Sequence, residues 1–333
     1  MSMLWEMVDP YVALDSRFAF AKPEDAASWV GATVAGFWGI AVRRCERIVL
    51  SSWNALAWLD TDAGKLLAKW SVAPGLHPRL AALAELTAWL HGRGLPVSPP
   101  LAALDGSLQL ATPKGSFGLQ EVRVGELLDP SDPAQVHAAG SILAALHDAL
   151  LAYPRAAAVV SSSGSSPPYD PGLLTGFGVR DQLTRWLGSV APGSTSAASA
   201  FLRDHIATFP EASLPAPQLV HNDIRSANIL CQGSQVSALL DFEEVTVNYR
   251  VSDLAKAAVL LGTRFRNWAP LDPELQRRFV DGYRDIHSLS SSEEASLPVL
   301  VVYRTLRQAP SGADPAGWAI AAERLAARPD PFR

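Results

Sequence analysis

The chain has 333 residues, of which 48% are hydrophobic and 18% charged, and its formal net charge is −5. This composition is typical of a folded globular protein, and a chain of this length usually forms more than one compact unit. Basic residues do not gather in a long run, so the electrostatic footprint of a nucleic-acid-binding protein is missing and no nucleic-acid partner is expected.

Cysteine usage and the first residues indicate the compartment. Cys45 and Cys231 lie far apart and lack the spacing of a zinc site or of a disulfide framework. The start of the chain carries Glu6 and Asp9 and lacks the basic and apolar regions of a signal peptide. No run of about eighteen apolar residues occurs, so no membrane partner is expected. We therefore expect a cytoplasmic protein.

The first third of the chain predicts a sheet with helices. Residues 23–37 open with proline and two acids, which is typical of a helix start. Three β-rich segments follow at 41–50, 53–60 and 65–71, with a hairpin turn at 60–64, and they predict an antiparallel sheet. Apolar residues at helical spacing predict a helix over 80–92, and 116–124 reads as a further strand.

The rest of the chain is mostly helical by the same criteria. Helices are predicted at 133–153, 180–187, 199–208, 252–261, 272–283, 293–307 and 317–327. Residues 161–168 are rich in serine, glycine and proline and predict a poorly packed loop. Such a loop is either a mobile lid or an insertion, and we favour the insertion.

Two neighbouring segments of the sequence contain the candidate catalytic and metal-binding residues. Residues 219–230 read LVHNDIRSANIL, and residues 238–243 read ALLDFE. We interpret them as two short apolar strands of one hairpin, each ending in acids, with Asp223, Asn228 and Asp241 converging at one end. Carboxylate and amide oxygens suit Mg²⁺, which proteins usually hold through one or two carboxylates together with waters and substrate phosphates. Phosphoryl transfer is the first hypothesis, and a plain Asp- and Asn-rich turn between core strands is the alternative.

The spacing of these residues resembles a known family. His221-x-Asp223-x-x-x-x-Asn228, followed thirteen residues later by Asp241-Phe242, is similar to the aminoglycoside phosphotransferase family, whose relatives include choline kinase and the protein kinases. The resemblance implies an α+β, two-lobe protein-kinase-like fold with a small antiparallel β N-lobe containing a helix and a larger, mostly α-helical C-lobe. The implied domains are an N-terminal helical segment at 1–40, a nucleotide-binding N-lobe at 41–123 and a catalytic, substrate-binding C-lobe at 124–333.

The resemblance also assigns roles to the motif. Asp223 would accept the proton of the acceptor hydroxyl, and Asn228 and Asp241 would hold Mg²⁺. His221 is the side chain best suited to proton transfer near neutral pH, but the resemblance favours a packed, structural histidine. Asp253 matches an acid that braces the backbone of the catalytic loop, which is also a structural role.

The resemblance also implies that ATP is the phosphoryl donor, with GTP as the alternative. The turn 51–54 falls where the family covers the phosphates; it lacks glycine, so Ser51 and Ser52 would serve, although an ordinary hairpin turn fits equally well. Lys69 would bridge phosphate oxygens and pair with Glu85, the alternatives being a solvated lysine and a surface glutamate. Lys65, beside the hairpin turn, is the better candidate for a solvated lysine.

Adenine would lie at the strand that joins the two lobes. The family places adenine against hinge backbone, which corresponds here to Gln120, Glu121 and Val122. The candidate apolar walls of the adenine site, all of which are equally compatible with the core, are Leu67, Leu119, Ile229 and Leu240.

Departures from the protein-kinase pattern disfavour a protein substrate. Asn222 replaces the usual arginine, Glu243 replaces the usual glycine, and no Ala-Pro-Glu segment follows Asp241. We therefore expect a small-molecule hydroxyl acceptor, phosphorylated with ATP and Mg²⁺. Candidate acceptor residues are Glu243, Glu244, Trp268, Asp281, Asp285 and Tyr303.

The acceptor itself is left open by the sequence. Antibiotic phosphorylation, conferring resistance, ranks slightly above a metabolic kinase acting on an amino alcohol, homoserine or a sugar. A catalytically inactive, pseudokinase-like binding module is the alternative of another class. The sequence is equally compatible with a monomer and with a homodimer.

Overall fold

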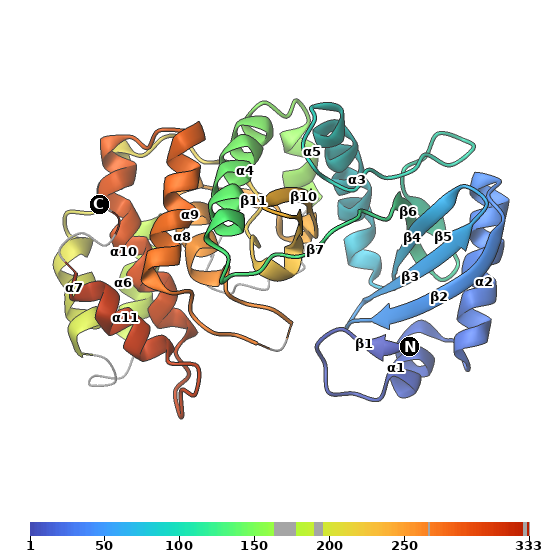
Figure 1. The fold of residues 1–333 in the computed structure, drawn as a ribbon, viewed down its shortest axis with the longest axis horizontal. Helices are drawn as coiled ribbons and strands as arrows, with labels where there is room; N and C mark the ends of the chain where they lie inside the picture. Colours follow the sequence, from blue (N-terminus) through green and yellow to red (C-terminus); the bar gives the residue numbers. More distant parts are fainter. Residues whose placement is uncertain (163–177, 190–195, 266, 329–331, 333) are drawn as a thin grey trace. The chain divides into compact units, whose positions relative to one another are not determined.

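The computed structural model describes residues 1–162, 178–189, 196–265, 267–328 and 332 (Figure 1). Contacts divide the chain into two compact units, which we treat separately. Unit 1 comprises Met1–Val124 with Tyr153–Ser166, and unit 2 comprises Gly125–Ala152 with Pro167–Arg333. Most of the predicted loop at 161–168 lies outside the described residues.

Unit 1 is built on a six-stranded sheet. Its strands are β1 (Ser2–Met3), β2 (Val42–Leu50), β3 (Asn54–Thr61), β4 (Gly64–Ser71), β5 (Leu110–Thr112) and β6 (Gly115–Glu121). The order is β1-β2-β3-β4-β6-β5, with β1 parallel to β2 and all other pairs antiparallel. Along β3 buried and half-buried residues alternate, as expected when successive side chains point to opposite faces of a sheet. The expected antiparallel strands and the hairpin after Asp60 are confirmed.

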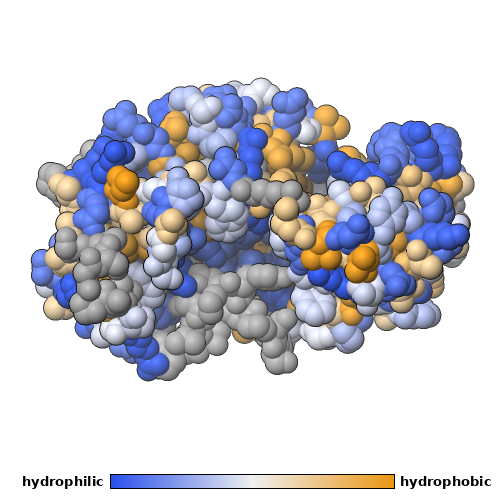
Figure 2. All heavy atoms as spheres, turned by 90° about the horizontal axis from the view of Figure 1, so that it is seen from below, coloured by the Kyte–Doolittle hydropathy of each residue, from blue (hydrophilic) through white to orange (hydrophobic). Residues whose placement is uncertain are grey.

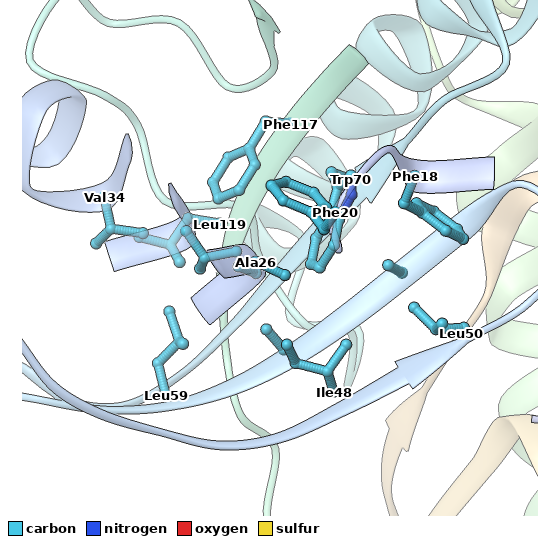
Figure 3. Packing of buried hydrophobic residues seen from close by; sticks show 14 of the residues in the cluster. Phe18, Phe20, Ala26, Val34, Ile48, Leu50, Leu59, Trp70, Phe117 and Leu119 are labelled. Atoms are coloured by element: carbon cyan, nitrogen blue, oxygen red, sulfur yellow. The ribbon is translucent and has the colours of Figure 1, made fainter. Parts of the chain in front are cut away.

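Two N-terminal helices belong to the core of this sheet. They are α1 (Pro10–Phe18) and α2 (Pro23–Trp38), and their buried residues join those of the strands in one cluster (Figure 3). Trp70 of β4 lies at its centre, with ring centroids 6.0 Å from Phe18 and 5.6 Å from Trp29. Residues 1–40, expected as a separate segment, therefore share the core of unit 1. The sequence patterns did not predict β1 or α1.

The other helices of unit 1 lie later in the chain. They are α3 (His77–Gly92) and the short α5 (Ala156–Ser161). Trp89 of α3 packs edge-on against Tyr153, with 5.2 Å between ring centroids. This contact attaches residues from beyond position 152 to the unit formed by the first 124 residues.

Unit 2 is mostly helical. Its helices are α4 (Pro133–Leu151), α6 (Val179–Ser189), α7 (Ser196–Ile206), α8 (Arg250–Leu260), α9 (Pro273–Ile286), α10 (Ser291–Gln308) and α11 (Trp318–Ala326). Helices α4 and α9 approach closely because each has a glycine at the contact. A Cβ added at Gly140 would lie 1.9 Å from the carbonyl oxygen of Phe279, and one at Gly282 would lie 2.0 Å from that of His137. The approach brings His147 of α4 within hydrogen-bond distance of Tyr283 of α9.

Two small sheets in unit 2 correct one prediction. One sheet has the order β10-β9-β7, formed by β10 (Gln235–Leu239), β9 (Ile229–Gln232) and β7 (Glu126–Leu127). The other pairs β8 (Gln218–Val220) with β11 (Thr246–Asn248). The strands before Asp223 and Asp241 are β8 and β10, so the expectation that they form one hairpin was wrong. Strand β10 pairs with β9 instead, because the short turn at Gly233-Ser234 joins these two directly.

On the face drawn in Figure 2, hydrophobic residues form small groups among hydrophilic ones. No helix in the described ranges is long and apolar enough to span a bilayer.

Candidate active site

His221 holds together the two loops that carry the predicted catalytic residues. Its side chain is buried, its Nε2 lies 3.1 Å from the carbonyl oxygen of Leu240, and its Nδ1 accepts the backbone N–H of Asp223 at 3.3 Å. These contacts place the proton on Nε2. Burial lowers the pKa of His221 despite the opposing charges of nearby carboxylates. A neutral ring with both nitrogens engaged fits the structural role expected for His221, and it brings the ends of β8 and β10 together.

Asp223 is oriented by two neighbours on its own loop. The amide Nδ2 of Asn228 donates to Asp223 Oδ2 at 2.7 Å and to the Asp223 carbonyl oxygen at 2.9 Å. Arg225 Nε donates to the same Oδ2 at 3.2 Å. Oδ1 of Asp223 has no hydrogen-bond partner in the described part of the chain, and the side chain keeps 17% of its exposure. One carboxylate oxygen is therefore fixed and the other is available to a hydroxyl group.

The residues predicted to bind metal have suitable free oxygens. Because Nδ2 of Asn228 points at Asp223, its Oδ1 is left as the possible ligand. Asp241 is exposed, and its carboxylate makes no hydrogen bond or ion pair within the described ranges. Its φ of 58° lies in the left-handed region, which aspartate tolerates better than most residues and which is often found at functional sites.

This donor set suits magnesium better than a metal that needs a protein cage. Among the described residues no group of three or more His, Cys, Asp or Glu side chains is arranged to hold a metal. Mg²⁺ does not require such a group, because it usually keeps several waters and binds one or two carboxylates with substrate phosphates. Asn228 and Asp241 fit that pattern, so they would hold Mg²⁺ and the metal would neutralise phosphate charge.

Asp253 on α8 accepts a hydrogen bond from the backbone of the catalytic loop. Its Oδ1 accepts the backbone N–H of Asn222 at 3.0 Å, and its Oδ2 lies 3.0 Å from Nε2 of His147. Burial alone would raise the pKa of Asp253, but the hydrogen bond of His147 and the positive charge of Lys256 help to lower it overall. These contacts support the bracing role predicted for Asp253.

In unit 1 the turn 51–54 has an unexpected partner, Glu6. Ser52 Oγ donates to the carboxylate of Glu6, which is also paired with Arg17, and Ser51 Oγ bonds Asn54 within the turn. Both hydroxyl groups predicted to face phosphates are therefore engaged with protein groups. Phosphate binding by this turn stays a prediction, with backbone amides as the remaining donors.

Lys69 and Glu85 are placed on different elements of unit 1. Lys69 is half-buried on β4, on the opposite sheet face from Trp70. Glu85 of α3 forms an ion pair with Arg155, and its pairing with Lys69 stays a prediction. Lys65 pairs with Glu46 and Asp60 and is half exposed, as expected for a lysine beside the turn.

Part of the backbone that is predicted to bind adenine already makes hydrogen bonds within the protein. Strand β6 ends at Glu121, whose carbonyl accepts from Ser98 Oγ at 2.6 Å, and Val122 N–H donates to Lys65 O at 3.3 Å. Gln120 pairs with Leu67 in the sheet. These bonds occupy part of the hinge backbone, so adenine binding there stays a prediction.

The four residues predicted to form the apolar walls of the adenine site differ in burial. Leu119 and Ile229 are almost completely buried, and Leu119 belongs to the core cluster of unit 1, so a role for either in adenine binding stays a prediction. Leu67 and Leu240 are half-buried and remain candidates.

The residues predicted to bind the acceptor also differ in burial. Glu243 and Glu244 are half-buried in the turn directly after Asp241, and Trp268 is 44% exposed with its ring 5.6 Å from Cζ of Arg225. Tyr303 is buried against Trp186 and belongs to the core.

Two of the predicted acids lie on α9 with partners of their own. Asp281 pairs with Arg284, and Asp285 pairs with His137. A role in acceptor binding for either acid stays a prediction.

Sequence reasoning missed Arg225 and Lys256. Arg225 was part of the motif but had no assigned role, although its position two residues after Asp223 was a usable signal. Lys256 is buried on α8, where its Nζ donates to Oδ1 of Asn222 at 3.2 Å. Its spacing of three residues from Asp253 places both on one face of the helix.

Comparison with known proteins agrees with this geometry. Residues 48–291 match the model of the phosphotransferase enzyme family, which includes the aminoglycoside phosphotransferases. The chain belongs to this family. The sequence-based assignment of its family is confirmed.

Individual relatives of this phosphotransferase differ in substrate. A homoserine kinase from Gluconobacter oxydans (strain 621H) is 27% identical over 216 residues, which are 65% of this chain and 64% of that protein. An amicoumacin kinase structure superposes with a TM-score of 0.57 at 14% identity, over 90% of this chain and 91% of the other. A microcompartment-associated aminopropanol kinase gives 0.55 at 20% identity, over 90% and 94%. The structural likeness confirms the two-lobe protein-kinase-like fold.

Proposed function

We propose that this phosphotransferase transfers the γ-phosphate of ATP, with Mg²⁺, to a hydroxyl group of a small metabolite. The observation that carries the proposal is the convergence of Asp223, Asn228 and Asp241 through His221. In this proposal unit 1 binds the nucleotide and unit 2 carries the catalytic and acceptor-binding residues. The solved amicoumacin kinase contains AMP-PNP and Ca²⁺, which supports the use of a nucleotide and a divalent metal here.

The proposed step balances without a covalent enzyme intermediate. The acceptor oxygen forms a bond to the γ-phosphorus as the bond from that phosphorus to the β–γ bridging oxygen breaks, and ADP leaves. The hydroxyl proton passes to Asp223 Oδ1, which accepts no hydrogen bond from the described residues. Mg²⁺ supplies charge neutralisation at the phosphates. Because such a reaction depends mainly on positioning and electrostatics, the fixed Oδ2 of Asp223 matters as much as the free Oδ1.

A metabolic acceptor is favoured over an antibiotic. The homoserine kinase is the relative matched by sequence over most of this chain, whereas the amicoumacin kinase is similar in fold at 14% identity. The charge beside Asp223 also supports this order, since Arg225 would repel a polycationic aminoglycoside. Phosphorylation of a natural-product antibiotic is the second candidate, supported by the fold of the amicoumacin kinase.

The test is mass-resolved phosphoryl transfer from ATP with Mg²⁺ to a panel containing homoserine, other hydroxy amino acids, amino alcohols, sugars and antibiotics. Asp223→Asn is the control, and its rate is expected to fall by about 100- to 10,000-fold, the usual contribution of a general base. Nucleotide binding should survive this substitution. If wild type binds no nucleotide, or if Asp223→Asn transfers phosphate as fast as wild type, the proposed function is wrong.

A further inference from the structure

We infer that Arg225 and Trp268 form an acceptor subsite that binds a carboxylate of the hydroxyl substrate. This inference rests on the proposed kinase function, because it concerns the molecule whose hydroxyl meets Asp223. It narrows the acceptor to short hydroxy acids, with hydroxy amino acids as the principal members of the class.

Arg225 is anchored at one nitrogen and open at the other two. Its Nε is bonded to Asp223 Oδ2 at 3.2 Å, and only 13% of its side chain is exposed. Within the described ranges, Nη1 and Nη2 have no hydrogen-bond partner. A guanidinium presents its donors as a rigid planar fork that matches a carboxylate or phosphate through two parallel hydrogen bonds. A nearly buried fork without protein acceptors is therefore suited to an oxyanion of a ligand.

Trp268 keeps this guanidinium in place and offers an apolar surface. The Cζ atom of Arg225 lies 5.6 Å from the centre of the Trp268 ring, within the range of a cation–π contact. The backbone of Trp268 is fixed because its carbonyl accepts from Trp318 Nε1 at 3.1 Å. The ring nevertheless remains 44% exposed. It can therefore pack against the carbon chain of a ligand while the guanidinium binds its charged end.

The segment that carries Trp268 is attached to the catalytic loop. Ser226 Oγ donates to the carbonyl oxygen of Thr263 at 2.9 Å, and Ser226 N–H donates to that of Leu261 at 3.1 Å. Ser226 is fully buried, so these bonds hold residues 261–263 firmly beside residues 223–228. The subsite is thus built from two connected segments of unit 2.

The acceptor explains these features better than the transferred phosphoryl group does. Asn228 and Asp241 already supply oxygens for the metal that neutralises phosphate. An exposed indole ring contributes nothing to a phosphoryl group, but it suits a short carbon chain. Asp223 and Arg225 are two residues apart and in direct contact, so a hydroxyl group at Asp223 and a carboxylate at Arg225 lie only a few bonds apart in the acceptor.

The test uses pairs of compounds that differ only in the carboxylate. The pairs are homoserine with 3-aminopropan-1-ol, serine with ethanolamine, and threonine with 1-aminopropan-2-ol. Affinity is measured by calorimetry in the presence of Mg²⁺ and AMP-PNP, and kcat and KM are measured with ATP. The variants are Arg225→Gln, which removes the charge, Arg225→Lys, which keeps the charge without the fork, and Trp268→Leu. Arg43→Gln is the control, since Arg43 is an exposed arginine on β2.

The expected result is a preference for the carboxylate in at least one pair. Arg225→Gln should weaken binding of the carboxylate member by about 10- to 100-fold, as expected for loss of a charge-assisted hydrogen-bonded pair, and leave the decarboxylated member within about twofold. Arg225→Lys should retain part of the affinity and Trp268→Leu should weaken both members. Thermal unfolding of each variant shows whether the fold is kept.

Three results would overturn the subsite. The first is that wild type shows no carboxylate preference in any pair, and the second is that Arg225→Gln weakens both members equally. The third is that Arg225→Gln lowers kcat alone with every acceptor, which would assign Arg225 to the phosphoryl group. The kinase proposal fails separately. Carboxylate-selective binding without phosphoryl transfer would leave the subsite standing and remove the kinase function, whereas phosphoryl transfer with no preference for the carboxylate in any pair would do the reverse.

Discussion

Asp253 joins His147 to the backbone of the catalytic loop. One carboxylate oxygen lies 3.0 Å from His147 Nε2 on α4, and the other accepts the N–H of Asn222 at 3.0 Å. Asn222 needs this support because its φ of 63° is a conformation that most residues avoid. The catalytic loop is therefore held by a buried polar network and not by a strand ladder of its own.

Asp253→Asn should destabilise the protein and slow the reaction. The carboxylate is 1% exposed. Replacing it with asparagine removes the negative charge near buried Lys256 and weakens the hydrogen bond with His147. Loss of one partner from a buried charged network costs about 3–5 kcal/mol. Urea unfolding should show this loss, and kcat should fall with it. Asp25→Asn, at an exposed position on α2, is the control and should unfold within about 0.5 kcal/mol of wild type. Equal stability of the two variants would contradict the bracing role.

His221 should make stability depend on pH in the weakly acidic range. Its pKa in the folded protein is lowered by burial, whereas in the unfolded chain it is near the ordinary value of about 6.5. As pH falls below about 6.5 the unfolded state takes up a proton that the folded state does not, so stability decreases. His221→Gln keeps a donor for Leu240 O and cannot titrate. Between pH 7 and pH 5, the urea midpoint of wild type should therefore fall more steeply than that of the variant. Parallel pH curves would mean that His221 is already charged in the folded protein.

Much of the fold could be predicted because it depends on local patterns. β-rich segments next to a turn predicted the strands of unit 1, and helical spacing predicted the long helices of both units. The N-terminal β1 could not be predicted, because two residues carry no period and the strand exists only through pairing with β2. The partner of β8 was missed for a related reason: strands of three residues pair according to tertiary contacts, which in this case join residues 218–220 to 246–248.

The meeting of the two candidate loops could be predicted, because their residues follow a recognisable spacing. Asp223, Asn228 and Asp241 follow from a spacing, and their loops do meet through His221 and Leu240. Residues that act through distant partners were not predictable. Glu6 lies 46 residues before Ser52, and nothing in the local sequence connects them. Arg225 had a local signal, but its role depends on Trp268, which only the folded chain brings near.

Asp241→Asn and Asp241→Ala should separate metal binding from backbone conformation. Asparagine tolerates the left-handed φ of 58° nearly as well as aspartate, whereas alanine is strained there. Both variants lose the carboxylate, so both should need at least about tenfold more Mg²⁺ for half-maximal nucleotide binding, and chelation of metal should mimic them in wild type. The alanine variant alone should also lose about 1–2 kcal/mol of stability. Unchanged Mg²⁺ dependence in the asparagine variant would remove Asp241 from the metal site.

Glu6→Gln should weaken ATP binding from outside the predicted phosphate site. Glu6 accepts hydrogen bonds from Ser52 and Arg17, and these lower its pKa although burial opposes them. Because the residues before α1 thereby fix the turn 51–54, removing the charge should loosen the backbone amides that we expect to meet the phosphates. A charge-assisted hydrogen bond contributes about 1.5–3 kcal/mol, so KM for ATP should rise by about tenfold or more.

Two matched variants make this prediction specific to the turn. Ser52→Ala removes one of the two partners of Glu6 and should also raise KM for ATP, while the double variant should cost less than the sum of the two single variants because both weaken the contact between Glu6 and Ser52. Glu24→Gln, at an exposed position on α2, removes a charge without touching the turn and should behave like wild type. KM for the acceptor should stay constant throughout. If Glu6→Gln leaves KM for ATP unchanged while Asp241→Asn raises the Mg²⁺ requirement, the turn 51–54 plays no part in holding the nucleotide.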